Sequence, residues 1–381
     1  MARSRRRAEL RNERLDRAID DLVTLAAEEW GTATPGASEQ VREMLVTSLR
    51  LLRDPPSSGD LLLINSTVKE LRHAMRVFRD YETVRKIAVF GSARTGIDHP
   101  DWAQAQRFSS EMVRRGWMVI TGAGGGIMEA AQGGAGRERS FGVNIRLPFE
   151  QTANDVIAGD RKCIHFRYFF TRKVTFVKNS HAIALFPGGF GTHDEGYEAL
   201  TLIQTGKSEI LPVVYVDEPG GSYWKDWDAY VRSHLHARGL ISEPDLSLYR
   251  VVDDVGEAVD EVVGFYRNYH SSRYVRSQLV LRLRVAPDDE QLEALNESFA
   301  DIVASGRIEN SGPLPAEAGE APGLPRLTLA FNRRSIGRLR QMIDRINAWG
   351  PGPGPGPGAS PHEIVSVELS DAAEWEESDD T

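Results

Sequence analysis

The stretch ALFPGGFGTHDEGYEAL, Ala184–Leu200, decides the fold because it joins two different apolar patterns through a glycine-rich turn. The run that leads into it, His181–Phe186, is short and apolar, which is typical of a strand covered on both faces. From Asp194 onward, apolar residues recur every three or four positions, which predicts a helix. Pro187–Thr192 is therefore a strand-to-helix turn.

The glycines of this turn suit a phosphate group. Backbone N–H groups without neighbouring side chains can approach a ligand closely, and the N-terminus of the helix adds partial positive charge. A tight turn in which Thr192 is the helix N-cap and Asp194 and Glu195 complement the helix dipole explains the same residues without any ligand. One glycine-rich turn leaves both interpretations open.

Strands and helices alternate from Lys86 to about His270. Five apolar runs predict strands, and amphipathic segments between them predict helices; the runs are KIAVFG, WMVITG, SFGVNIRLP, HAIALF and EILPVVYVD. This alternation implies right-handed crossovers between parallel strands. We therefore expect an α/β fold with a Rossmann-like, doubly wound parallel sheet.

Glycines follow three of these strands, at Gly91–Ser92, at residues 122–126 and at residues 188–191. In an open parallel sheet, ligands bind at the carboxyl ends of the strands, near the point where the strand order reverses. Three such loops on one edge favour a phosphorylated ligand more strongly than one loop does. No loop has the Gly-Lys-Ser/Thr of a Walker motif, and GAGGGIMEA is only weak evidence for a dinucleotide.

The rest of the chain surrounds this domain. Residues 1–84 predict a helical N-terminal extension, and residues 85–273 form the Rossmann-like domain. Residues 274–349 predict a small α+β module with no catalytic cluster. Residues 350–381 read as a glycine-proline linker followed by an acidic disordered tail.

Composition narrows the class of protein. The net charge of −9 over 381 residues disfavours nucleic acid as a partner, although the first fourteen residues are basic. No apolar run approaches the length of a membrane span, so we expect a cytoplasmic protein without a membrane partner. Cys163 is the only cysteine, and His165, His181 and His193 lack zinc-type spacing, so we predict no metal and no cofactor.

Three motifs resemble one known family. PGGFGTHDE, residues 187–195, matches the PGGxGTxxE signature of the Lonely Guy phosphoribohydrolases, a family long labelled as lysine decarboxylases. TRKVTFVKNS places Arg172 and Lys173 in the matching upstream position, and TGAGGGIMEAAQGGA resembles the second glycine loop of the long bacterial members. The resemblance covers about residues 86–270. His193 and Asp194 fill variable positions of the signature, and GSARTG is longer than in compact plant members.

The resemblance implies hydrolysis of the N-glycosidic bond of a nucleoside 5′-monophosphate, of the AMP or cytokinin riboside type, to free base and ribose 5-phosphate. It makes Glu195 and Arg172 the catalytic residues. A carboxylate beside the ribose stabilises an oxocarbenium-like sugar and activates water, and a guanidinium binds phosphate or ribose oxygens in a fixed fork. Taken alone, Glu195 is an ordinary first-turn glutamate and Arg172 an ordinary ion-pair partner.

The remaining predicted site residues bind the substrate. They are Gly91, Ser92, Gly124, Gly125, Gly126, Met128, Glu129, Lys173, Gly188, Gly189, Gly191 and Thr192. The alternative to substrate binding for Lys173 is a purely structural role. Tyr168, Phe169 and Phe170 either stack on the base or belong to the core.

Two functions remain, an enzyme and a nucleotide-binding sensor without turnover. The presence of both Glu195 and Arg172 favours the enzyme, because a pure binder has no need of them. A decarboxylase would need a lysine that carries pyridoxal phosphate, and no motif marks one. We also expect a homodimer or a higher homo-oligomer, because the helix of Arg172 is apolar on more than one face.

Overall fold

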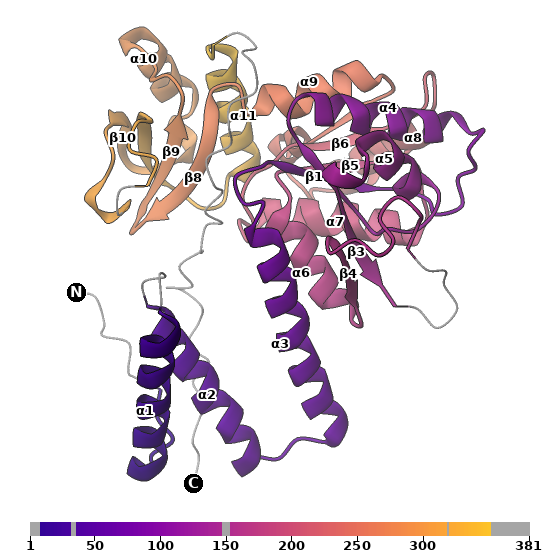
Figure 1. The fold of residues 1–381 in the computed structure, drawn as a ribbon. Helices are drawn as coiled ribbons and strands as arrows, with labels where there is room; N and C mark the ends of the chain where they lie inside the picture. The colour runs from indigo at the N-terminus through magenta and orange to yellow at the C-terminus, as the bar shows by residue number, and fades with distance from the viewer. Residues whose placement is uncertain (1–7, 32–35, 147–152, 318–319, 352–381) are drawn as a thin grey trace. The chain divides into compact units, whose positions relative to one another are not determined.

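The computed structural model describes residues 8–31, 36–146, 153–317 and 320–351 (Figure 1). The chain divides into two compact units, Met1–Lys69 and Glu70–Thr381. Of the predicted linker and acidic tail, only Gly350 and Pro351 lie among the described residues. No helix in this part of the chain is long and apolar enough to cross a membrane.

The first unit is helical, which confirms the predicted N-terminal extension. It contains α1 (Glu13–Trp30), α2 (Ala37–Arg53) and the first half of α3 (Ser58–Arg79). α1 and α2 pack against each other. Between them Arg42, which is buried, donates a hydrogen bond of 2.7 Å to the carboxylate of Asp20.

The second unit is built on a seven-stranded sheet in the order β4-β3-β2-β1-β5-β6-β7. Every neighbouring pair is parallel. The chain moves outward from β1 in one direction to β4, and then from β5 in the other direction to β7, so the order reverses between β1 and β5. This confirms the Rossmann-like, doubly wound fold. The strands are β1 Lys86–Phe90, β2 Met118–Thr121, β3 Ser140–Ile145, β4 Cys163–Phe166, β5 Ala182–Leu185, β6 Val213–Val216 and β7 Tyr249–Val252.

The two edge strands, β4 and β7, are absent from the five strands that the sequence predicts. Both are four residues long and carry polar side chains, with His165 exposed on β4 and Arg250 exposed on β7. Such short mixed runs lack the continuous apolar pattern by which the central strands are recognised. The central strands do have it, since all residues of β1, β2, β5 and β6 are buried.

Helices cover both faces of this sheet. α4, α5 and α9 contact one another or the strands on one side, and α6 contacts β3 and β4 on the other, where α7 also lies (Figure 1). α8 packs on β7. Their bounds are α4 Pro100–Arg114, α5 Ile127–Ala135, α6 Phe169–Asn179, α7 Phe190–Gln204, α8 Tyr223–Tyr230 and α9 Val255–Phe265.

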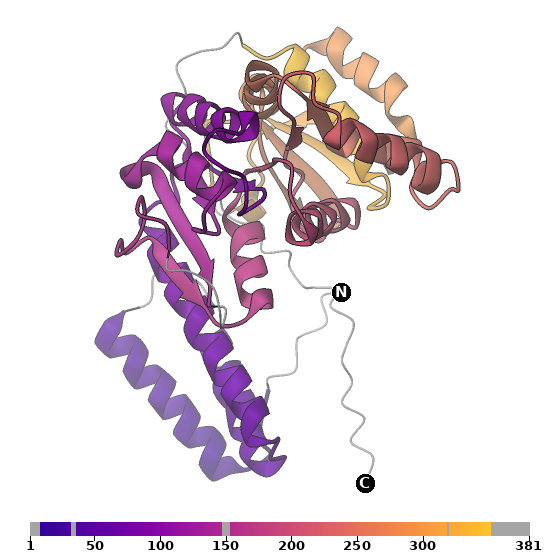
Figure 2. The same cartoon turned by 90° about the vertical axis from the view of Figure 1, so that its right-hand side faces the viewer.

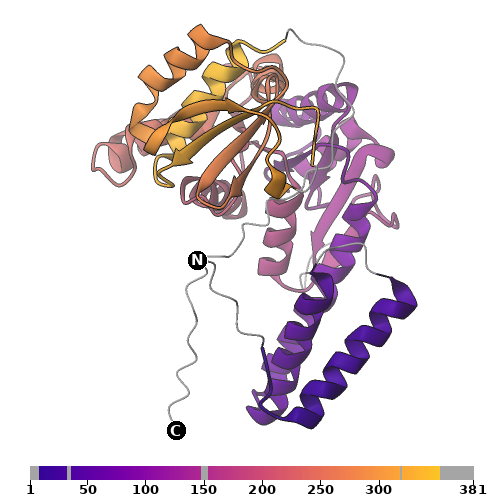
Figure 3. The ribbon, with the colours of Figure 1, turned by 90° about the vertical axis from the view of Figure 1, so that its left-hand side faces the viewer.

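The C-terminal module is a four-stranded antiparallel sheet in the order β10-β11-β9-β8, with α10 and α11 on one of its faces (Figures 2 and 3). α11 also contacts α7 and α9, which joins the module to the larger sheet. The small α+β module predicted from the sequence is thereby confirmed, and β8 and β10 are added to it. The elements are β8 Tyr269–Val275, β9 Gln278–Leu283, α10 Asp289–Ser298, β10 Val303–Ser311, β11 Arg326–Phe331 and α11 Ile336–Ala348.

Candidate active site

The loops that follow β1, β2 and β5 meet where the strand order reverses, and Ser92 lies at their centre. Its amide donates a hydrogen bond of 3.0 Å to the carbonyl of Pro187, and its own carbonyl accepts one of 3.0 Å from the amide of Ile127. A Cβ on Gly126 would lie 2.2 Å from the carbonyl oxygen of Ser92, and Gly126 has a φ of +64°. A Cβ on Gly188 would lie 2.9 Å from the amide nitrogen of Ser92. The structure therefore brings the three predicted glycine loops together by close backbone contacts that only glycine permits.

Two asparagines hold the second of these loops. Asn144 donates a hydrogen bond of 3.1 Å to the carbonyl of Gly122, and Asn154 donates one of 2.8 Å to the carbonyl of Gly124. Neither residue lies near the loop in sequence, so no local pattern indicated either of them. The predicted ligand residue Met128 packs against this loop, with its sulfur 2.8 Å from where a Cβ of Gly122 would be. The carboxylate of Glu129 lies 3.8 Å from the corresponding position at Gly125.

The N-terminus of α7 faces open space. The helix begins at Phe190, its N-cap residue is Gly189, and no side chain caps it. A Cβ added to Gly189 or Gly191 would meet no atom within 4 Å. An uncapped helix start with small residues leaves amide groups available to an anion.

Thr192 does not cap this helix, so the ligand-free interpretation of the turn is wrong on this point. Thr192 lies inside the first turn and is buried, and its amide donates a hydrogen bond of 3.0 Å to the carbonyl of Gly189. Its hydroxyl lies 2.2 Å from where a Cβ of Gly188 would be, so the side chain packs against the turn. The glycines themselves start the helix, a possibility that the preference for a polar N-cap residue conceals.

Arg172 and Lys173, from α6, lie beside Glu195, from α7. A guanidinium nitrogen of Arg172 is 3.4 Å from one carboxylate oxygen of Glu195, and the ammonium of Lys173 is 3.7 Å from the other. Lys173 also lies 2.9 Å from a carboxylate oxygen of Asp194 and 2.8 Å from one of Glu198. The side chain of Glu195 is only 6% exposed, so these charges act on it with little screening by water.

Burial raises the pKa of Glu195 above its usual range, and the charges of Lys173 and Arg172 oppose this effect. Burial alone would lower the pKa of Lys173, but hydrogen bonds to Glu198 and Asp194 outweigh it and raise the pKa. Arg172 lies 5.1 Å from the ring centre of Phe169, and its buried Nε has no hydrogen-bond partner among the described residues. The site therefore combines a buried carboxylate of raised pKa with two neighbouring cations.

A tyrosine from α8 completes the turn, and nothing in the sequence indicated it. The hydroxyl of Tyr223 donates a hydrogen bond to the carbonyl of Gly188 and lies 2.7 Å from Nε2 of His193. Exposed aromatic side chains also lie at the starts of α6 and α7. Phe169 and Phe170 are about half exposed, at 50% and 47%, so neither belongs to the core, and Phe190 at the start of α7 is 96% exposed.

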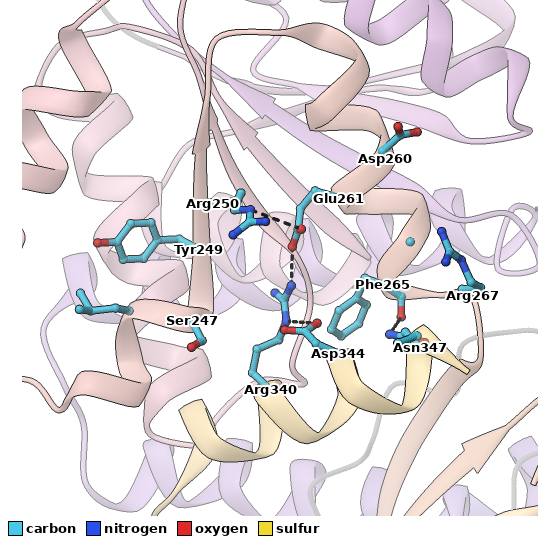
Figure 4. Close-up of a pocket in the computed structure, with 13 residues that line it drawn as sticks. Ser247, Tyr249, Arg250, Asp260, Glu261, Phe265, Arg267, Arg340, Asp344 and Asn347 are labelled. Carbon is cyan, nitrogen blue, oxygen red and sulfur yellow. Dashed lines mark hydrogen bonds and ion pairs between the residues drawn. The ribbon is translucent and has the colours of Figure 1, made fainter. Parts of the chain in front are cut away.

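A separate cavity of about 430 Å³ lies between β7, α9 and α11 (Figure 4). The side chain of Arg340 crosses it and pairs with Glu261 and Asp344. Tyr249 and Arg250 line it at the start of β7, so it lies at the amino ends of the strands, opposite the glycine loops. No predicted site residue lines this cavity.

Residues 125–262 match the model of a family described as possible lysine decarboxylase. The match contains Arg172, Lys173 and the whole PGGFGTHDE motif, and it confirms the family resemblance over this segment. No curated protein sequence matches the chain.

The solved structures similar to this chain include two molybdenum cofactor proteins. One is the molybdenum cofactor binding protein of the phototrophic bacterium Rippkaea orientalis, at 18% identity over 46% of this chain and 94% of that chain, with a TM-score of 0.33. The other is the molybdenum cofactor carrier protein of Chlamydomonas reinhardtii, at 20% identity over 47% of this chain and 96% of that chain, also with a TM-score of 0.33.

Proposed function

We propose that this chain hydrolyses the N-glycosidic bond of a nucleoside 5′-monophosphate, giving the free base and ribose 5-phosphate. The observation that carries the proposal is the position of Glu195. It is buried, it lies between Arg172 and Lys173, and it belongs to the same helix whose uncapped N-terminus faces open space. Phosphate binding and the catalytic carboxylate are thus supplied by one rigid element.

The dimensions of α7 suit this substrate. Glu195 is five residues beyond Phe190, which at about 1.5 Å per residue corresponds to roughly 8 Å along the helix axis. A phosphate at the first turn would therefore place its ribose alongside Glu195. Binding energy from the phosphate then positions the sugar for reaction, because remote contacts can be used to orient the reacting centre.

Glu195 acts on the sugar and on water. Its carboxylate stabilises the positive charge that develops on the ribose as the bond to the base breaks. It also accepts a proton from the attacking water, whose oxygen forms the new bond to the sugar, and the departing base takes up a proton in turn. Arg172 orients the substrate oxygens, since a guanidinium offers donors in a fixed plane.

A decarboxylase that uses pyridoxal phosphate fits these residues poorly. The cofactor would need a lysine amine that gives up its proton readily. Lys173 is the lysine of this site, and three carboxylates surround its ammonium and raise its pKa. The family label is therefore a weaker guide to function than the side chains.

A nucleotide-binding protein without turnover is the second candidate. The ion pairs of Glu195 with Arg172 and Lys173 favour it, because they satisfy the carboxylate without any substrate. In that case the loops would bind a monophosphate and the bond to its base would stay intact.

The test is hydrolysis of a panel of monophosphates, with free base measured by chromatography. We expect wild-type activity on at least one of AMP, GMP, CMP, UMP or a cytokinin riboside monophosphate. Glu195→Gln should reduce kcat by about two to four decades, the usual contribution of a positioned acid or base. Glu198→Gln is the matched control, because Glu198 also contacts Lys173 but lies about one helical turn further from the glycine turn at residues 187–192.

Glu198→Gln should stay within tenfold of wild type. Activity of Glu195→Gln within a few-fold of wild type would remove Glu195 from its role. Tight binding of a monophosphate by the wild-type protein, with no free base released from any of the panel, would establish the non-catalytic candidate instead.

A further inference from the structure

Three side chains outside the α6–α7 site converge beside the carboxyl edge of the larger sheet. His99 is the N-cap residue of α4, Asp101 lies in the first turn of that helix, and Glu218 lies in the loop that follows β6. One nitrogen or oxygen atom from each of the three lies within 4.8 Å of the others. Nδ1 of His99 is 3.5 Å from Oδ2 of Asp101. The sequence conceals this group, because more than a hundred residues separate Glu218 from His99 and Asp101.

Asp101 gives the second, independent observation. Its side chain is only 6% exposed, and its Oδ1 has no hydrogen-bond partner among the described residues. A buried carboxylate without a full set of partners is costly, which indicates a missing cation.

We propose that His99, Asp101 and Glu218 bind a divalent cation of the zinc type. One imidazole and two carboxylates form a ligand set that zinc accepts, with water in the fourth position. Two ligands at zinc distances and a tetrahedral angle lie about 3.4 Å apart. The His99–Asp101 contact already has nearly this spacing, and Glu218, which is partly exposed, has to approach by at most about 1.4 Å to reach the same spacing.

Nδ1 of His99 also accepts a hydrogen bond of 3.2 Å from the amide of Asp101. Binding a cation through this nitrogen exchanges that long hydrogen bond for coordination. The cation joins the loop after β1 to the loop after β6. The second of these loops leads directly to Trp224, whose amide bonds to Asp217, and to Tyr223, which contacts Gly188. The ion is therefore a brace for two loops at this edge, and it touches none of the proposed catalytic residues.

The test uses the full chain, freed of metal with a chelator and then dialysed. Zn²⁺ is titrated by calorimetry, and thermal unfolding is followed with and without Zn²⁺. We expect one site that binds Zn²⁺ at least tenfold more tightly than Mg²⁺, since Mg²⁺ prefers an all-oxygen shell. Zn²⁺ should also raise the Tm, because a ligand that binds only the folded state stabilises it.

Asp101→Asn and Glu218→Gln should each weaken Zn²⁺ binding at least tenfold and abolish the rise in Tm. Asp98→Asn is the matched control, since Asp98 is an exposed acid of the same loop outside the cluster, and it should bind as wild type does. If Asp101→Asn fails to fold, His99→Ala, at the exposed end of the cluster, replaces it. Equal Zn²⁺ affinity in wild type and in these variants, or equal affinity for Mg²⁺ and Zn²⁺, would overturn the proposal.

Discussion

Glu195 is held in a balance that one neighbour can shift. Burial raises its pKa, while Lys173, the stronger of the two opposing charges, and Arg172 lower it. Lys173 is itself fixed by Asp194 and Glu198, so its charge is well placed but cannot move far. The proton affinity of Glu195 is therefore set mainly by its burial, and Lys173 is the charge that most strongly opposes this effect.

Lys173→Gln should move the acid side of the pH profile of kcat/KM to higher pH. Glu195 has to be ionised to accept a proton, so activity is lost as the pH falls through its pKa, which already lies above the usual value. Removing the ammonium takes away an effect that lowers this pKa, so activity is lost at a higher pH than in wild type. Lys178→Gln, on the same helix, is the control. An unchanged acid limb, or one displaced to lower pH, would contradict the assignment of Lys173.

At the scale of elements, the turn between β5 and α7 depends on two adjacent glycines for different reasons. Gly188 is enclosed, because an added Cβ would meet the hydroxyl of Thr192 at 2.2 Å and the amide of Ser92 at 2.9 Å. Gly189 is open, because the same atom would meet nothing within 4 Å. The first glycine is required by the fold, and the second leaves space that a ligand can fill.

Replacing each glycine by alanine separates these roles. Gly188→Ala should lower the Tm by several degrees and abolish activity, since a backbone shift follows and about 1–3 kcal/mol of stability is lost by overpacking. Gly189→Ala should leave the Tm within about a degree and still weaken AMP binding, which calorimetry measures. Normal AMP affinity in Gly189→Ala would place the phosphate elsewhere.

The elements also show what could be predicted from the sequence. The central strands are predicted correctly, because their apolar pattern is strong and continuous, whereas the helix after β6, α8, is missed. The edge strands β4 and β7 are missed, because four residues with an exposed polar side chain give no clear period. The start of α7 is misplaced by the preference for a polar N-cap, where the structure uses Gly189.

The candidate site also contains residues that the sequence predicts and residues that only the fold reveals. The motifs bring Arg172, Lys173 and Glu195 together, since a resemblance carries spatial information that spacing alone does not. Tyr223 and Asn154 act on the glycine loops from other parts of the chain, and only the fold places them there. His99 and Glu218 meet for the same reason, because the loops after β1 and β6 end at one edge of the sheet.

At the scale of the whole molecule, we propose a homodimer through α6. Phe169, Phe170 and Val174 are 50%, 47% and 49% exposed, and Arg172 lies against the ring of Phe169. Apolar side chains exposed together on one helix favour an interface, and twofold pairing is the commonest kind. The partner would then lie beside the site.

Val174→Asp should convert the dimer to a monomer in light scattering and reduce activity. Its charge would have to be buried at the interface, which is costly. Leu52→Asp, at an exposed apolar residue of α2, is the control and should leave the assembly unchanged. A fully active wild-type monomer at micromolar concentration would exclude this interface.

The central place of β1 in the sheet has a consequence for folding during synthesis on the ribosome. β1 pairs with β5 in a register that sets Ile87 against Ala182, so its second neighbour is made 182 − 87 = 95 residues later. At about 5–20 residues per second, the emerging chain waits roughly 5 to 20 s with that edge of β1 unpaired. The hydrogen bond between Ser92 and Pro187 can form only after this interval, so the glycine loops assemble late in synthesis. We expect a chaperone to bind the growing chain while the strand edge of β1 is unpaired.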